Sequence, residues 1–329
     1  MVSLKRSNHL SDTVNELIIR HNEFTHQQYL EYKKKQKVTA DISQSSLLDG
    51  ARIYQLGKIY TDLENETSNV IDAMVGHIFE DGFCQLMGND YQFELPLTYD
   101  INGAWGKWTI SMRMDMVKFD DDKKIHIKDF KFTSSYTIKT VRKEIYDYEK
   151  TKNPEVLKHK YIWQMLGYAY GSKQNGYDVQ SLSLITYNKH WSYRLASEDK
   201  SFPPSSLYEI QIPMIDMQFV ENYLQERVTY HQGSDQHMEK SGHPVLCTAE
   251  DMWLGDHKPY AVMMKGKKRA VKLFDNLESA DSFAESIQDG YVEHRPIPLG
   301  IRCRDYCIFA KNNVCDQYNR KIKELNNGQ

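Results

Sequence analysis

Residues 106–132 show an alternation of apolar and polar side chains that predicts two neighbouring strands. In the first strand one face is apolar: Trp108, Ile110, Met112, Met114 and Met116. This period of two places Asp115 on the opposite face. After an acidic turn at residues 120–122, the second strand carries Asp129 and Lys131 on one side. Because so short a turn favours a hairpin, we expect Asp115 and Asp129 to lie close together on adjacent strands.

Asp115, Asp129 and Lys131 together have the chemistry of a metal-dependent nuclease site. Two carboxylates held close together repel each other unless a cation lies between them, and oxygen ligands suit Mg²⁺ or Mn²⁺. A neighbouring lysine can orient an attacking water or stabilise charge on a phosphate. The alternative is a solvated strand end, because Asp-x-Lys occurs by chance in many soluble proteins.

Two expected helices add further polar candidates. The helix at residues 69–87 places His77 and Glu80 on one face, where an imidazole and a carboxylate can complete a metal shell. An ordinary, partly buried histidine is the alternative for His77. In a helix spanning residues 161–168, Gln164 shares a stripe with Tyr161 and Tyr168. A glutamine in such a stripe needs a hydrogen-bond partner, which indicates a site.

The order of these motifs resembles the PD-(D/E)XK nuclease superfamily, and in particular its RecB-like branch. The motifs are the helix segment Gly76 to Glu80, then Asp115, then Asp129-Phe-Lys131, and finally Gln164 and Tyr168. The resemblance covers about residues 65–195. It implies an α/β fold with a restriction-endonuclease-like core, in which helices flank a central mixed sheet.

The resemblance also assigns roles to individual residues. It implies these metal ligands: Asp115, Asp129, the carbonyl of Phe130 and, from the helix, His77 or Glu80. Lys131 would be the catalytic lysine, acting with Asp115, Asp129 and Glu80. Relatives commonly have a histidine farther from the helix acid than His77 is from Glu80, so both helix residues are candidates. Gln164 and Tyr168 would line the DNA path.

Four of the five cysteines lie in the last quarter of the chain: Cys247, Cys303, Cys307 and Cys315. The N-terminal sequence has no signal peptide, and the chain has no apolar run long enough to cross a bilayer. We therefore expect a cytoplasmic protein in a reducing environment, where thiols bind metal more readily than they form disulfides. Their spacing matches no standard zinc finger, so a structural zinc and an iron-sulfur cluster both remain open.

The cysteine pattern is similar to that of AddB-type and CRISPR-associated nucleases, which hold a 4Fe-4S cluster with one early cysteine and three later ones. The resemblance implies a cluster on Cys303, Cys307, Cys315 and a replacement for the early cysteine, which is absent from residues 45–52. Cys247 is the candidate replacement. Structural Zn²⁺ is the leading alternative, and free buried thiols are the third.

The patterns divide the chain into three regions. Residues 1–64 form an N-terminal helical region, 65–235 the nuclease core, and 236–329 a cysteine-rich region. Within the last, residues 258–295 predict a ββα insertion: a hairpin at 260–274, a helix from 277 to 287 and a third strand near 291. The hairpin tip is basic and suits phosphates, although lysine-rich turns are more often only solvated.

Composition narrows the function further. The chain has 329 residues and a formal net charge of −3, which argues against coating nucleic acid by bulk electrostatics but permits a local basic channel. Its 22 tyrosines include candidates for stacking on unpaired bases, such as Tyr187, although most tyrosines are core or rim residues. No phosphate-binding Gly-x-x-x-x-Gly-Lys loop is present, so any helicase must be a partner.

The sequence thus favours a Mg²⁺- or Mn²⁺-dependent exonuclease that acts on DNA with free ends in recombination, replication or repair. Its size and the short insertion between the cysteines resemble uncharacterised bacteriophage nucleases. This resemblance implies action in the host cytoplasm, with a helicase or recombinase as a possible partner and no membrane. Two alternatives are a catalytically inactive DNA-binding module and a zinc-stabilised assembly protein. Oligomeric state, polarity, and exonuclease against endonuclease action are left open by the sequence.

Overall fold

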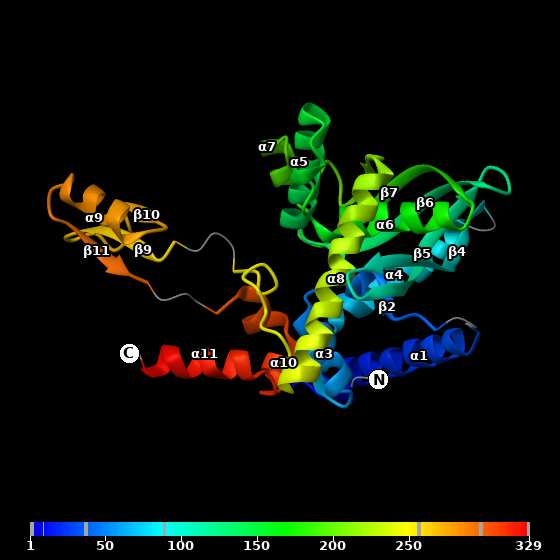
Figure 1. The fold of residues 1–329 in the computed structure, drawn as a ribbon, viewed down its shortest axis with the longest axis horizontal. Coiled ribbons are helices and arrows are strands. Elements are labelled where there is room, and N and C mark those ends of the chain that lie inside the picture. Colours follow the sequence, from blue (N-terminus) through cyan, green and yellow to red (C-terminus); the bar gives the residue numbers. More distant parts are fainter. Residues whose placement is uncertain are drawn as a thin grey trace. The chain divides into compact units, whose positions relative to one another are not determined.

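The chain divides at Val245 into two units, Met1–Val245 and Leu246–Gln329. The computed structural model describes residues 3–8, 10–35, 39–87, 90–254, 258–295 and 299–327. Residue 236, where the sequence predicts the cysteine-rich region to begin, lies inside helix α8 (Met217–Ser241). This helix continues to Gly242, whose positive φ of 72° and N–H bond to Met238 O end it. Figure 1 shows the elements of both units.

A mixed sheet is the centre of the first unit. Its strands are β2 (Ile42–Ser43), β4 (Gln92–Gly103), β5 (Gly106–Phe119), β6 (Lys124–Thr133), β7 (Asp178–Asn188) and β8 (Leu207–Ile212). The order is β2-β5-β6-β7-β8, and β4 pairs with β5. β2–β5 and β6–β7 are parallel, and the other pairs are antiparallel. The expectation of an α/β fold with a central mixed sheet flanked by helices is confirmed.

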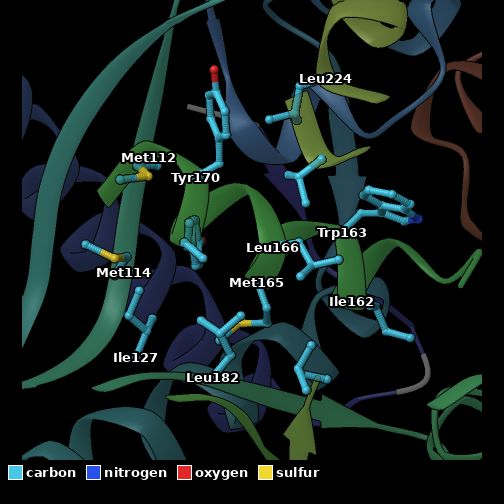
Figure 2. Close-up of a cluster of buried hydrophobic side chains, with 14 of the residues drawn as sticks. Met112, Met114, Ile127, Ile162, Trp163, Met165, Leu166, Tyr170, Leu182 and Leu224 are labelled. Carbon is cyan, nitrogen blue, oxygen red and sulfur yellow. The ribbon is translucent and has the colours of Figure 1, made fainter. Parts of the chain in front are cut away.

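Helices cover both faces of this sheet. On one face lies α4 (Ile71–Met87), whose Phe79 and Phe83 rings lie 5.8 and 4.8 Å from the ring of Phe130 on β6. On the other face, α6 (Lys160–Gln174) and α8 enclose the main core. Figure 2 shows part of this core: Met112, Met114, Ile127, Leu182, Met165 and Leu166. Gly171 lets α6 approach closely, because a Cβ there would lie 2.5 Å from the Tyr99 ring.

Local sequence explains how β5, β6 and β7 are joined. In the β5–β6 turn, Asp121 Oδ1 accepts hydrogen bonds from the N–H groups of Lys123 (3.0 Å) and Lys124 (2.7 Å). After β6, Ser134 caps α5 (Ser135–Thr151), and His159 caps α6. These helices form the crossover that returns the chain to β7 parallel to β6.

The remaining elements of the first unit are short, apart from one long helix. They are β1 (Ser3–Lys5), α1 (Asp12–Lys35), α2 (Gln44–Leu47), α3 (Ala51–Ile59), β3 (Glu64–Glu66), the 3₁₀ turns Thr67–Asn69 and Pro154–Val156, and α7 (Tyr193–Glu198). β1 and β3 form a separate parallel pair. Within the described residues, no helix is both long and apolar enough to cross a bilayer.

The second unit contains the predicted small sheet and a helical segment with the cysteines. Strands β9 (Tyr260–Met264), β10 (Lys272–Phe274) and β11 (Gly290–His294) form an antiparallel sheet in the order β10-β9-β11. Helix α9 (Leu277–Glu285) packs Ala280 and Ala284 on Val262. β10 occupies only the last three residues of the expected hairpin at 260–274. A π-helical turn (Arg302–Tyr306), α10 (Ile308–Lys311) and α11 (Asp316–Asn327) follow.

Candidate active site

Three carboxylates from three elements converge beside the centre of the sheet. Glu80 of α4, Glu94 of β4 and Asp115 of β5 each place an oxygen so that all three atoms lie within 4.8 Å of one another. An octahedral ion with metal–oxygen distances near 2.1 Å holds its ligand oxygens about 3.0–4.2 Å apart. The group is therefore of the right size and chemistry for one divalent cation.

Asp115 and Asp129 occupy the adjacent strands that the sequence predicts. Met116 pairs with Lys128 in the antiparallel register of β5 and β6. Asp115 Oδ2 accepts a hydrogen bond of 2.8 Å from the N–H of Phe130, the residue between Asp129 and Lys131. Asp115 thus contacts the backbone of the Asp-x-Lys motif directly.

Asp129 and Lys131 form a buried ion pair. Their side chains are 0% and 16% exposed. Burial raises the pKa of Asp129 to about 7, with a further contribution from Asp115 and an opposing one from Lys131. Burial disfavours the ammonium form of Lys131, but Asp129 and Asp115 outweigh it and raise the pKa of Lys131 above its usual value. Lys131 therefore remains a cation on the cavity wall.

The pKa of Glu80 is raised by burial and by the carboxylates around it. Its pKa is about 8. Burial is the largest cause of the rise, the negative charges of Asp115, Glu94 and Asp129 add to it, and the positive charge of Lys131 opposes it. Burial also raises the pKa of Glu94, against the opposing effect of its ion-pair partner Arg113. A cation bound among these carboxylates would stabilise their charged forms and so lower the pKa values of both Glu80 and Glu94.

Glu94 is the site residue that the sequence analysis missed. It has a φ of 55°, and it lies between the pairs Phe93–Met116 and Leu95–Met114, whose unshifted register places it opposite Asp115 on β5. Residues opposite each other on neighbouring strands present their side chains on the same face, which brings the Glu94 carboxylate beside that of Asp115. In the sequence, Glu94 only alternates with apolar Phe93 and Leu95, a pattern equally typical of a solvated strand face. No local signal distinguishes the two cases.

His77 lies on the same cavity as Glu80 but outside the carboxylate group. Its ring is 5.8 Å from that of His21 on α1, centroid to centroid. Partial burial and then the neighbouring His21 lower the pKa of His77, which keeps the imidazole neutral. Of the two helix candidates, Glu80 is the one that the fold brings together with Asp115.

Gln164 and Tyr168 lie behind Asp129. Gln164 Nε2 donates to Asp129 Oδ1 (3.3 Å) and to the Tyr168 hydroxyl (2.6 Å), which in turn donates to Arg113 O (3.0 Å). The predicted partner of the glutamine is therefore Asp129. Tyr168 is only 4% exposed, whereas Gln164 is half-buried. The hydrogen bonds of these two residues lead to the Asp129 carboxylate.

A cavity of about 330 Å³ opens beside the carboxylates. Glu80, Asp115 and Lys131 form its charged wall, and the rings of Phe79, Phe132 and Tyr187 form another. At its edge Asp72 of α4 forms an ion pair with Lys189, which follows β7. The cavity thus joins the ionic site to an aromatic surface.

In the second unit, hydrogen bonds gather the segments that carry the four predicted cysteine ligands. Cys247 N–H donates to Gln317 Oε1 (2.8 Å), and Gln317 Nε2 donates to Cys247 O (3.1 Å), close to Cys315. Arg302 N–H donates to Met252 O (3.2 Å) and Arg302 O accepts from Cys307 N–H (2.7 Å). Cys303 lies in the turn between these last two residues.

The cysteine sulfurs do not form a compact tetrahedral set. Among the described residues, the only group of three or more possible ligand atoms within 4.8 Å is the carboxylate group. Zn–S distances of 2.3 Å require sulfurs about 3.8 Å apart. The cysteines therefore differ from a preformed mononuclear zinc site.

Comparisons with known proteins are sparse. No protein-family model and no curated protein matches the sequence. A solved structure titled "Crystal structure of SSO0001" has a TM-score of 0.41 and 15% sequence identity, and the match covers 63% of this chain and 84% of that one. A likeness at this level assigns no family and no activity to the chain.

Proposed function

We propose that this protein is a divalent-cation-dependent deoxyribonuclease that hydrolyses phosphodiester bonds from DNA ends. The observation that carries the proposal is the convergence of the Glu80, Glu94 and Asp115 carboxylates beside a cavity that Glu80, Asp115 and Lys131 line. The order of the motifs, which resembles that of the RecB-like nucleases, supports the same assignment. In this proposal β5 and β6 are the catalytic strands of a restriction-endonuclease-like core.

The donor set supports Mg²⁺ or Mn²⁺ as the cofactor. Carboxylate oxygens are hard ligands, and the three meet within the span of one coordination sphere. Asp129 and the carbonyl of Phe130 complete the proposed ligand set from the neighbouring strand. The bound ion would lower the pKa of a coordinated water and stabilise the charge that develops on the phosphate.

The chain's own residues supply the remaining chemistry. Lys131 is charged, largely buried and held by Asp129, so it can orient a water or a phosphate oxygen without first losing much conformational freedom. Gln164 fixes the Asp129 carboxylate from the opposite side. This arrangement positions both groups before the substrate binds.

For the second unit we propose a 4Fe-4S cluster on Cys247, Cys303, Cys307 and Cys315, with a structural role. In such a cluster each cysteine binds a different iron, so the sulfurs lie farther apart than around one zinc ion. The hydrogen bonds that join the Cys247 segment to Gln317, two residues after Cys315, and the resemblance of the cysteine pattern support this donor set. Zinc remains the alternative that metal analysis distinguishes.

The test is cleavage of end-labelled linear single- and double-stranded DNA by anaerobically purified protein with Mn²⁺. Wild type is compared with Lys131→Ala and with the matched control Lys128→Ala, which removes a lysine on the same strand that pairs with Glu209 (2.6 Å). We expect wild type and the control to cut, and Lys131→Ala to lose about 100-fold or more in rate.

The product pattern separates the modes of action. Stepwise release of short products from one end shows exonuclease polarity, whereas internal fragments show endonuclease action. If wild type cuts no substrate with Mg²⁺ or Mn²⁺, the nuclease proposal fails, and a DNA-binding module takes its place.

A further inference from the structure

The aromatic wall of the active-site cavity has no part in the chemistry of hydrolysis. Phe132 and Tyr187 are paired residues on the parallel strands β6 and β7. Their rings are stacked, with centroids 5.3 Å apart and an angle of 8° between the planes. Phe79 of α4 packs on Tyr187 at 4.8 Å. Two strands and one helix therefore hold the three rings in one aromatic surface.

This surface is not ordinary core. The hydrophobic cluster beneath α4 is built on Met116, Phe130 and Ile185, and Phe79 packs against it, but it includes neither Phe132 nor Tyr187. Both rings are half-buried and line the cavity. Aromatic side chains that line a cavity beside charged groups suit a ligand that is flat at one end and ionic at the other.

The size of the cavity restricts that ligand. Its volume of about 330 Å³ lies at the lower end of the range for small-molecule sites, which begins at about 300 Å³. A single nucleotide matches this scale, whereas a base pair within a duplex does not. The faces of a base in a duplex are also covered by its neighbours, so only an unstacked base can contact the rings.

We propose that Phe132 and Tyr187 form a stacking subsite for one unpaired nucleobase next to the scissile phosphate. The phosphate would lie against Lys131 and the carboxylates, and the base against the aromatic pair. The substrate class is then DNA with an unpaired strand end, either single-stranded DNA or an overhang, in preference to a blunt duplex. This inference rests on the proposed nuclease function only for the placement of the phosphate.

Binding without cleavage tests the subsite. The full-length protein in EDTA is titrated into single-stranded oligonucleotides that carry 2-aminopurine at one terminal position, because this base loses fluorescence when it stacks. We expect quenching by wild type and by Tyr187→Phe, which keeps the ring. We expect Tyr187→Leu to lose the quenching and to bind about 5- to 150-fold more weakly, the fold-change for 1–3 kcal/mol of lost stacking.

Tyr193→Leu is the matched control. Tyr193 is 79% exposed on α7 and does not line the cavity, so its replacement is expected to leave quenching and affinity unchanged. Phe132→Leu is the second subsite variant, and circular dichroism verifies that each variant is folded. A folded Tyr187→Leu and a folded Phe132→Leu that both quench and bind as wild type overturn the subsite.

A cleavage assay distinguishes failure of the stacking subsite from failure of the proposed nuclease function. With Mn²⁺, wild type is expected to degrade single-stranded and overhanging DNA faster than blunt duplex, and Tyr187→Leu to lose that preference. Cleavage without any effect of Tyr187→Leu sinks the subsite and leaves the nuclease standing. Quenching that depends on Tyr187, with no cleavage of any DNA, supports the subsite and sinks the nuclease.

Discussion

The carboxylate site and the cysteine segment offer a similar number of metal-ligand candidates but are built in different ways. Glu80, Glu94 and Asp115 stand on a helix and two long strands, and Met114 and Met116, which flank Asp115, are both 0% exposed. Cys303 and Cys307 instead stand in a single turn and at the start of the four-residue helix α10. Hydrophobic packing fixes the first set, whereas hydrogen bonds of the backbone and of the Gln317 side chain gather the segments of the second.

This difference in how the two sites are held predicts how each would respond if its proposed metal were removed. A sheet with helices on both faces remains folded when its carboxylates repel one another, because apolar burial exceeds the electrostatic cost. Short turns with few buried residues bury less apolar surface, so the proposed metal would supply part of the folding free energy of the cysteine segment. The predictions below test this contrast, beginning with the largest effect.

Replacing Cys303 and Cys307 together by Ser is expected to abolish metal binding by the second unit. The purified protein should lose its bound iron, and protease should cut within residues 246–329 while the first unit keeps its cooperative melting transition. Metal analysis, limited proteolysis and thermal melting measure the three quantities. Cys84→Ser is the control, because burial and then Glu80 raise the pKa of this thiol to about 12 and keep it protonated. Equal iron in all three proteins contradicts the prediction.

Asp129→Asn is expected to lower the cleavage rate by more than about 100-fold, beyond the effect of a residue that only orients a ligand. The amide keeps the shape of the side chain but loses the charge that holds Lys131. The first unit should retain its melting transition, in contrast to the cysteine variant. Asp178→Asn, at the exposed start of β7, is the matched control. Near wild-type cleavage by Asp129→Asn would remove this residue from the catalytic set.

Glu94→Gln is expected to weaken Mn²⁺ binding about 10- to 100-fold. Titration calorimetry on the DNA-free protein measures the affinity. Glu149→Gln, at an exposed position of α5, is the control and should bind Mn²⁺ as wild type does. Wild-type affinity in Glu94→Gln would mean that the carboxylate serves only its ion pair with Arg113.

The smallest effect concerns the pH dependence of the first unit. His231 is 1% exposed and its Nε2 is 3.1 Å from Leu47 O. Burial and then Arg227 lower its pKa to about 4 from 6.5. The unfolded chain therefore takes up a proton at higher pH than the folded one. The resulting stability is complete above pH 6.5 and is lost as the pH falls toward 4, by about 3 kcal/mol at most.

Urea unfolding at pH 7 and pH 4.5, followed for the first unit, measures this dependence. His231→Gln removes the titrating group but can still donate to Leu47 O, so its loss of stability on acidification should be smaller. Identical losses in wild type and His231→Gln would show that other groups dominate.

The sequence was sufficient for the parts of the site that depend on local patterns. The alternation around Asp115 and Asp129 predicts two strands, and they pair as β5 and β6. The helix expected at residues 69–87 is α4, Ile71–Met87. Both follow from side-chain periodicity, which a single sequence shows directly.

Two features depended on tertiary packing and could not be foreseen. Glu94 alternates like a solvent-facing residue, and only its position opposite Asp115 and close to Glu80 of α4 makes it part of a site. Tyr168 belongs to a helical stripe whose sequence does not say whether it meets solvent or sheet, and the sheet buries it. Side-chain periodicity in a sequence identifies the faces of a helix or strand, but not which other element covers each face.

The strained backbone of Glu94 sets stability against activity at one position. A glutamate at a φ of 55° is held in a conformation that glycine or asparagine adopts at lower energy. A selection for heat resistance alone should therefore favour Glu94→Gly or Glu94→Asn, whereas a selection for DNA degradation should keep the acid. The ranking of substitutions at this residue would thus report, in one experiment, whether stability or activity determines which residue stands there.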